Sequence, residues 1–182
     1  MTNAELFAKL RPIVMLATGV PECILAETVS PSGGEVKAPS GPYASITPRQ
    51  MVTERGQANV IASDIPGDLV RYDVRAQIMC SVGVNFYRGE ALLYAERLKQ
   101  ANKRPDISVM LFKAGLGWNG TDAVNNLTSL QSANWEQRSQ ITLRIMYETS
   151  SLPEVNNILS ASVIVENEKA EVIEEFTVQA IP

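Results

Sequence analysis

Apolar and polar side chains alternate along one long segment, and this pattern constrains the fold more than any other feature of the chain. From Val70 to Phe86, seventeen residues, every even position is apolar and the odd positions are mostly polar, as at Arg71 and Gln77. Successive side chains of a β-strand point to opposite faces, so the pattern predicts one long, half-buried strand. The same alternation places Cys80 on the buried face.

Shorter patterns predict the other elements. Thr2 and Glu5 have the spacing of a capping box, and Pro12 predicts a kink or two short helices that meet there. Residues 107–114 alternate like a strand, but Pro105 before them favours a helix start, and we favour the helix. Pro48 predicts an edge strand or a bulge within 43–54. The expected elements are helices at 2–17, 89–104 and 107–114, strands at 23–29, 43–54, 70–86 and 141–147, turns at 63–68 and 118–121, and a hairpin formed by 160–165 and 171–178.

These elements predict an α+β fold in which helices pack on one face of a mostly antiparallel β-sheet. The chain has 182 residues, about the length of one domain, so we expect a single domain over 1–182. Residues 31–42 hold three prolines and three glycines, which predicts a long loop that is functional or acts as a partner-binding arm. An acidic C-terminal hairpin at about 160–178 completes the expected fold.

The composition argues against several classes of protein. Apolar residues make up 45% of the chain and charged residues 20%, as in an ordinary globular domain and unlike a disordered, coiled-coil or membrane-spanning chain. We find no targeting segment at the N-terminus and expect a cytoplasmic product that starts at Met1.

Residue types needed for common chemistry are scarce. The chain has no histidine, which removes the most frequent general base and most zinc or iron sites. Cys23 and Cys80 cannot complete a metal's ligand shell by themselves, and two buried thiols are favoured over a disulfide. We therefore expect no enzyme, no cofactor, and no catalytic or metal-binding residues.

The charge is concentrated near the C-terminus. The net charge is −4 with a pI near 5.0, and no basic cluster of the kind that grips nucleic acid is present. The segment from Glu166 to Glu175 by itself carries a net charge of −4. A solvated hairpin edge is favoured there over an acid–base pair or a cation site. Its acidic residues are Glu166, Glu168, Glu171, Glu174 and Glu175.

Gly115, Gly117 and Gly120 fit the G-x-G-x-x-G pattern of dinucleotide-binding loops. That fingerprint needs a strand before it and a helix after it, with the pyrophosphate at the N-terminus of the helix. Residues 121–130 are rich in Asn, Thr and Ser and predict a poor helix. We therefore interpret the glycines as turn residues.

Two short motifs lie at the entries of expected strands. The Pro/Gly loop ends in Gly41-Pro42-Tyr43-Ala44-Ser45-Ile46, and Asn134-Trp135-Glu136-Gln137-Arg138 precedes the strand at 141–147. Over residues 4–165 the chain resembles the neck or tail terminator proteins of bacteriophages. The resemblance lies in the order of the helix, the loop, the long strand, the Gly-rich turn near 114–117 and these two motifs.

The resemblance implies a structural virion protein of the tail or neck, assembled in the host cytoplasm. A homo-hexameric ring would cap the tail tube and join it to the head connector or neck proteins, and to a sheath if the tail is contractile. DNA would pass through its lumen without sequence-specific binding. The alternatives are a small-molecule or peptide-binding module with loop 31–42 as a lid, and a hydrolase built on the C-terminal glutamates.

Overall fold

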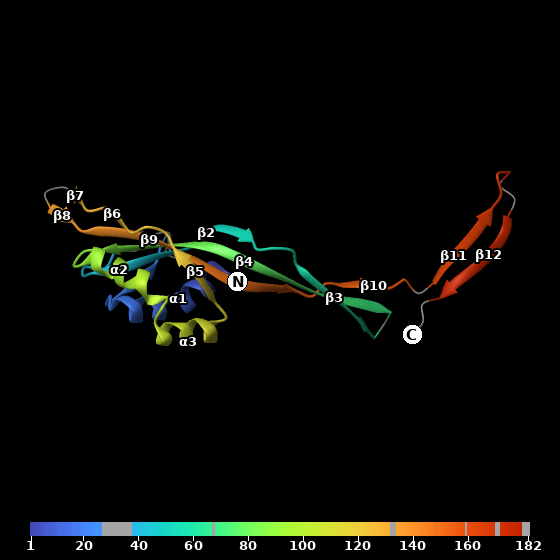
Figure 1. Cartoon of the computed structure of the whole chain (residues 1–182), viewed down its shortest axis with the longest axis horizontal. Coiled ribbons are helices and arrows are strands. Elements are labelled where there is room, and N and C mark those ends of the chain that lie inside the picture. Colours follow the sequence, from blue (N-terminus) through green and yellow to red (C-terminus); the bar gives the residue numbers. More distant parts are fainter. Residues whose placement is uncertain (27–37, 67, 132–133, 159, 170–171, 180–182) are drawn as a thin grey trace, which may run out of the picture. The chain divides into compact units, whose positions relative to one another are not determined.

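The computed structural model describes residues 1–26, 38–66, 68–131, 134–158, 160–169 and 172–179 (Figure 1). The chain divides into two compact units. Unit 1 comprises Met1–Gln57 and Ala76–Thr149, and unit 2 comprises Ala58–Arg75 and Ser150–Pro182. That the two units form one domain stays a prediction.

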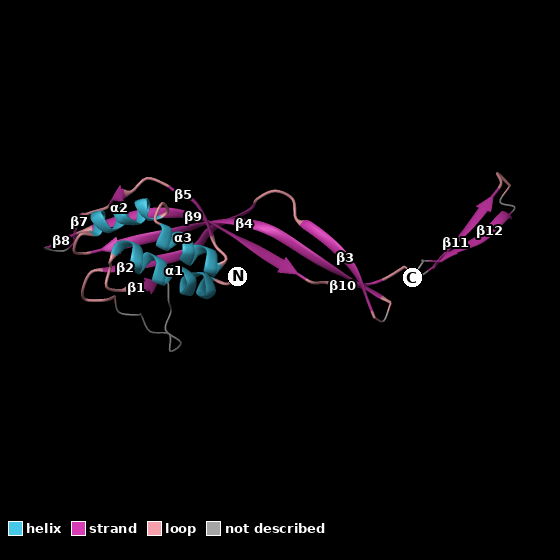
Figure 2. Cartoon of the chain, turned by 60° about the horizontal axis from the view of Figure 1, so that its bottom comes forward, coloured by secondary structure: helices cyan, strands magenta, loops and turns pink. Residues whose placement is uncertain are grey.

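Unit 1 is a sheet with three helices on one side (Figure 2). The strand order is β1-β2-β4-β9-β5, in which β1 is parallel to β2, and the short β6 also pairs with β9. The expected α+β fold with a mostly antiparallel sheet is confirmed. The elements are α1 Asn3–Thr18, β1 Cys23–Leu25, β2 Tyr43–Glu54, β4 Leu69–Tyr87, α2 Ala91–Ala101, α3 Pro105–Ala114, β5 Gly117–Thr121, β6 Asn125–Asn126, β7 Ser129–Gln131, β8 Asn134–Glu136 and β9 Arg138–Ser151.

The core of unit 1 lies between the sheet and the helices. The even positions of β4 from Ile78 to Phe86 are buried, which confirms the predicted inner face of this strand. Fully burying each large apolar side chain contributes about 1.5–3 kcal/mol. The largest side chains that are almost fully buried include Leu6, Leu10 and Ile13 of α1, Leu98 of α2, Ile107 of α3, and Ile141, Leu143 and Ile145 of β9.

Helix α1 begins with the predicted capping box. The Thr2 amide donates to a Glu5 carboxylate oxygen at 2.7 Å, and the Glu5 amide donates to the Thr2 hydroxyl at 3.2 Å. The helix continues through Pro12, so the alternative of two short helices is wrong. Pro12 lies on the exposed side, and the buried apolar residues on the other side offset the roughly 3 kcal/mol that an interior proline costs.

Proline also shapes β2. The pairing of β2 with β4 shifts register between Thr47 and Met51, which confirms the bulge predicted at Pro48. Arg49 has a φ of 52° there, and its guanidinium donates to the Met1 carbonyl at 2.9 Å. The bulge therefore lets one β2 side chain bond to the start of α1.

Several expected boundaries are wrong. The second helix ends earlier than expected, because α2 stops at Ala101. The helix expected over 107–114 is confirmed as α3, and Pro105 begins it, as its fixed φ favours at a first helical position. The turn expected at 118–121 is strand β5, because Gly120, at a φ of 90°, sits in a bulge that keeps the strand paired with β9. The strand expected at 23–29 ends at Leu25, and 27–29 lie outside the described residues.

The part of the Pro/Gly loop at 31–37 lies outside the described residues, whereas 38–42 are described. The Arg88 guanidinium donates to the Pro39 carbonyl at 2.5 Å. A Cβ atom on Gly89, which has a φ of +56°, would lie 2.9 Å from the Pro42 ring. The end of the loop is thus anchored where β4 ends.

Unit 2 consists of strands and has no helix among its described residues. Strand β3 (Asn59–Ile65), the first part of β4 and β10 (Glu154–Asn156) form one antiparallel sheet. The turn expected at 63–68 is shorter, because 63–65 belong to β3. Strands β11 (Ser160–Glu166) and β12 (Val172–Gln179) form the predicted hairpin. No described helix is long and apolar enough to cross a membrane.

Candidate assembly surfaces

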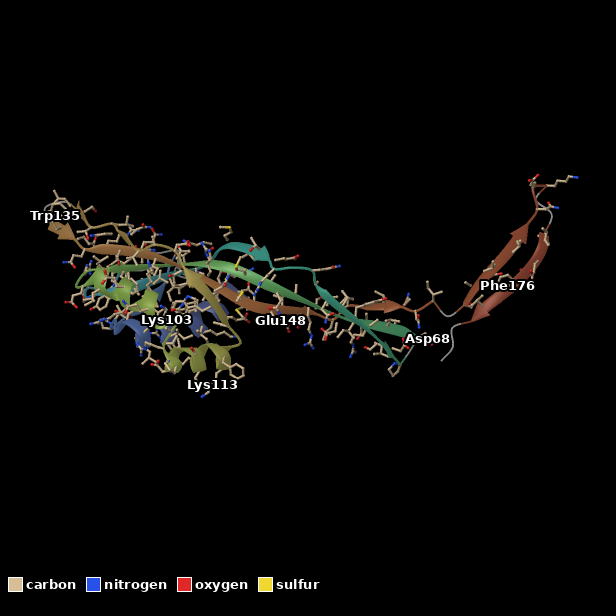
Figure 3. All side chains as sticks on the ribbon, in the orientation of Figure 1. Asp68, Lys103, Lys113, Trp135, Glu148 and Phe176 are labelled. Atoms are coloured by element: carbon tan, nitrogen blue, oxygen red, sulfur yellow. The ribbon has the colours of Figure 1, made fainter. Side chains whose placement is uncertain are left out.

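The β11–β12 hairpin has one apolar and one polar face. Residues paired across two antiparallel strands share a face. Val163 pairs with Phe176, and these side chains lie on what we call the apolar face; Phe176 is 44% exposed (Figure 3). The next pair along the hairpin, Ile164 and Glu175, lies on the other face. The apolar face comprises Ala161, Val163, Val165, Phe176 and Val178, with Glu174 beside them.

The acidic residues of the hairpin do not form one wall. Glu174 pairs with Val165 on the apolar face, whereas Glu175 lies on the polar face. Glu168 lies in the turn, and Glu171 lies outside the described residues. Acid–base catalysis by two carboxylates requires both to face one substrate. The neighbours Glu174 and Glu175 cannot do this, because they point away from each other.

The three-stranded sheet of unit 2 is also two-faced. Val60 pairs with Val74 and Val155 with Val70, and all four lie on one side. Val60 remains 54% exposed. The other side carries ion pairs, Arg71 with Glu154 at 2.7 Å and Arg75 with Asp73 at 2.8 Å. Both sheets of unit 2 thus combine exposed apolar residues with charge.

Charge differs between the units. Unit 1 contains 13 cationic and 11 anionic side chains, a net charge of +2, and unit 2 contains 3 cationic and 9 anionic side chains, a net charge of −6. Like-charged surfaces repel and opposite ones attract over about one Debye length, ~8 Å at physiological salt. Unit 2 is therefore suited to a cationic partner.

Helix α3 exposes an apolar patch in unit 1. Phe112 is 86% exposed, the largest value among the described large apolar side chains, and Val109 lies one turn before it on the same side. Lys113 is exposed on α3 as well (Figure 3). The Lys9 ammonium donates to the Ala114 carbonyl at 2.6 Å. The outer face of α3, formed by Val109, Phe112 and Lys113, therefore combines apolar area with one exposed cation.

The two sequence motifs at the strand entries meet in space. Tyr43 stacks on Tyr87 with ring centroids 4.7 Å apart, and the Arg138 guanidinium lies 5.1 Å from the Tyr87 ring. Arg88 lies 3.4 Å from a Glu136 carboxylate oxygen. The motifs therefore hold the ends of β2, β4 and β9 together. Nothing in the sequence singled out Tyr87 and Arg88, since their partners lie about fifty residues away along the chain.

The β7–β8 hairpin, whose second strand belongs to the motif at 134–138, exposes a second apolar patch. Trp135 is 73% exposed and pairs with Leu130, which is 58% exposed. Trp135, the middle residue of β8, is labelled in Figure 3. Exposed tryptophans are frequent anchors of protein interfaces. In the motif at 134–138, Glu136 and Arg138 thus make contacts within unit 1, whereas Trp135 is exposed.

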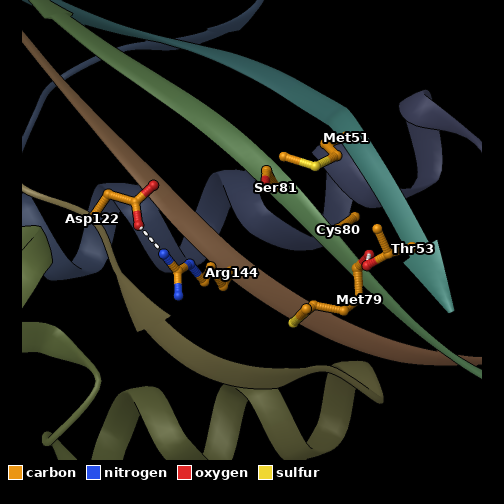
Figure 4. Close-up of a pocket in the computed structure, with 7 residues that line it drawn as sticks. All are labelled: Met51, Thr53, Met79, Cys80, Ser81, Asp122 and Arg144. Atoms are coloured by element: carbon orange, nitrogen blue, oxygen red, sulfur yellow. Dashed lines mark hydrogen bonds and ion pairs between the residues drawn. The ribbon is translucent and has the colours of Figure 1, made fainter. Parts of the chain in front are cut away.

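A shallow pocket lies on the sheet of unit 1 (Figure 4). Met51, Met79 and the ion pair between Asp122 and Arg144, 2.6 Å apart, line much of it. Its volume of about 240 Å³ is smaller than the ~300–1,000 Å³ of typical ligand sites. Cys80, which also lines the pocket, is almost fully buried.

The two cysteines and the glycines of the G-x-G-x-x-G pattern occupy positions that stabilise the fold. Both thiols are free and buried; burial raises the pKa of Cys23 to about 12 and also raises that of Cys80, so neither is an activated nucleophile. Gly115 caps α3 and Gly117 begins β5, which is helix then strand, the reverse of a dinucleotide loop. Within the described residues no cluster of three or more Cys, Asp or Glu could hold a metal ion.

Exposed apolar patches beside charged residues are typical of a protein that assembles with other proteins. The sequence profile of a family described as phage neck terminator protein matches residues 4–170, and the chain belongs to this family. It is therefore a structural protein of the phage virion, located in the neck or tail and associated with other head and tail proteins. No curated protein sequence matches the chain.

Proposed function

We propose that the chain forms a homo-hexameric ring that caps the tail tube and joins it to the head connector. The observation that carries the proposal is the exposed apolar face of the β11–β12 hairpin, in a unit whose charge is opposite to that of unit 1. A ring requires a heterologous interface, in which one patch of each subunit meets a different patch of the next. The chain carries such unlike patches in the hairpin and in α3.

The ring has two further contacts to make, with the tail tube on one side and the connector or neck proteins on the other. A contractile tail would add the sheath as a partner. The exposed pair of Trp135 and Leu130 is a suitable anchor for one of these contacts. Loop 31–42 is the proposed partner-binding arm, since its described end is fixed to unit 1 through Arg88.

DNA passes through the lumen without being held. Lysine and arginine on the wall would bind phosphates by releasing counterions, whereas carboxylates keep the backbone free. The polar face of the hairpin, with Glu175 among serine and threonine residues, suits such a wall better than the apolar face does.

Two measurements test the proposed ring. The first is the mass of the purified protein in solution, and the second is electron microscopy of tail tubes mixed with the protein. We expect a hexamer in solution or at tube ends, and tubes with one capped end. A protein that stays monomeric both free and with tubes, and leaves the tube ends bare, would refute the proposal.

The lumen is tested by retention on duplex DNA across a salt series. Wild-type rings should not be retained on duplex DNA at any salt concentration. Glu175→Lys rings should be retained on the DNA at low salt and released as the salt concentration rises. Tight binding by the wild-type ring would contradict a repulsive wall.

A further inference from the structure

We infer that the apolar face of the β11–β12 hairpin in one copy of the chain docks on the outer face of α3 in a neighbouring copy. The inference rests on the proposed ring and names the surfaces that hold its subunits together.

The apolar face of the hairpin requires a partner. A two-stranded sheet by itself is marginally stable in water, and it needs further strands or a helix packed on its apolar face. Val163, Phe176 and Val178 are each between 37% and 52% exposed. Covering them removes apolar area from water, which stabilises both the hairpin and the contact.

Charge favours unit 1 of another copy as that partner. Unit 2 carries −6, so two hairpins facing each other would bring like charges together. Unit 1 carries +2. A contact between unit 2 of one copy and unit 1 of the next is therefore attractive, and it repeats around a ring because every copy has both surfaces.

Within unit 1, α3 matches the hairpin in chemistry. Phe112 and Val109 offer apolar area where the hairpin offers Phe176 and Val163. Glu174, the carboxylate on the apolar face of the hairpin, would face the Lys113 ammonium, which is exposed near the end of α3. Aromatic anchors at the centre and charged residues at the rim are the usual composition of a protein interface.

Cysteine crosslinking tests which chains meet. Phe112→Cys protein is mixed with Val163→Cys protein and oxidised, with the same pairing of Phe112→Cys and Ile164→Cys as the matched control. The native thiols do not compete because both are buried. We expect a covalent dimer from the first mixture, little from the control, and a ladder of higher oligomers from the Phe112→Cys/Val163→Cys double variant.

Serine substitutions measure the contribution of each surface. Phe176→Ser and Phe112→Ser should each weaken the assembly on the order of 30-fold or more, the effect of losing a central anchor. Ile164→Ser, one position along on the other face, should have little effect. Glu174→Lys and Lys113→Glu should each weaken assembly, and their combination should restore it.

The outcomes separate this inference from the ring. Rings or capped tubes that form no crosslink between Phe112→Cys and Val163→Cys chains refute the docking and leave the ring intact. A crosslink confined to single chains of the double variant refutes it as well, because the hairpin would then cover its own copy. Failure to form any ring refutes the proposed function, and the docking with it.

Discussion

The same alternating strand pattern is buried in unit 1 and left partly exposed in unit 2. In unit 1 the even positions of β4, such as Val82 and Val84, are buried under α1, α2 and α3. In unit 2 the same alternation continues through Val74 and Tyr72, which are only partly buried, beside Val60, which is more than half exposed. An alternating sequence thus defines an apolar face without supplying the layer that covers it.

The difference separates two roles. Unit 1 obtains its stability from within the chain, through helices that pack on the sheet. Unit 2 leaves several large apolar side chains about half exposed, among them Val60, Ile164 and Phe176, as is typical of an interaction surface. Opposite net charges on the two units add selectivity to that surface.

The largest expected effect comes from placing the same charge in each unit. Val82→Lys buries an unpaired ammonium in the core of unit 1 and should cost roughly 3–5 kcal/mol, much of a typical domain's stability of ~5–15 kcal/mol. Val163→Lys should barely change the melting temperature of the free chain, because Val163 is exposed there. Thermal unfolding followed by circular dichroism measures both. Equal losses would show that the hairpin is covered within its own chain.

Removal of 31–42 tests whether the arm belongs to assembly or to folding. Loops tolerate deletion better than core strands, so the shortened chain should melt within a few degrees of the wild type. It should no longer assemble with its partners. Sedimentation velocity and thermal melting together check this, and normal assembly of the shortened chain would exclude the arm.

Thiol reactivity should distinguish the units under native conditions. Because burial raises the pKa of Cys23 to about 12, that thiol is almost entirely protonated at pH 8 and should react with a disulfide reagent only after unfolding. Cys80 should behave in the same way. A Val163→Cys thiol should react at once in the free chain and become protected in the assembly. Rapid reaction of the native cysteines would show that unit 1 opens easily.

The smallest effect is expected at the start of α1. Thr2→Ala removes the side-chain cap and should cost about 1 kcal/mol, with no change in assembly. The bond from the Thr2 amide holds the pKa of Glu5 below its usual range. The stabilisation by the charged form is therefore present at neutral pH and is lost as the pH falls through the lowered pKa. The difference in melting temperature between wild type and Glu5→Gln should accordingly disappear in acid.

Local sequence patterns were sufficient to predict much of the structure of unit 1. The capping box, the long strand with its inner face and the bulge at Pro48 follow from steric rules that act over a few residues. Strand β3 was missed, because its exposed residues belong to a sheet whose apolar side has no covering layer within the described part of unit 2. The turn expected around Gly120 became a bulge because pairing with β9 outweighed the local preference.

The sequence by itself determined the fold class, the buried face of β4 and the concentration of acid near the C-terminus, since each depends on spacing or composition along the chain. Only the tertiary structure brought Tyr43 against Tyr87 and Arg88 toward Glu136, because these contacts join segments about fifty residues apart. The strand register likewise placed Glu174 beside Val165, and the packing of α3 on unit 1 left Phe112 exposed. Contacts between distant segments depend on how the elements pack, which local preferences do not specify.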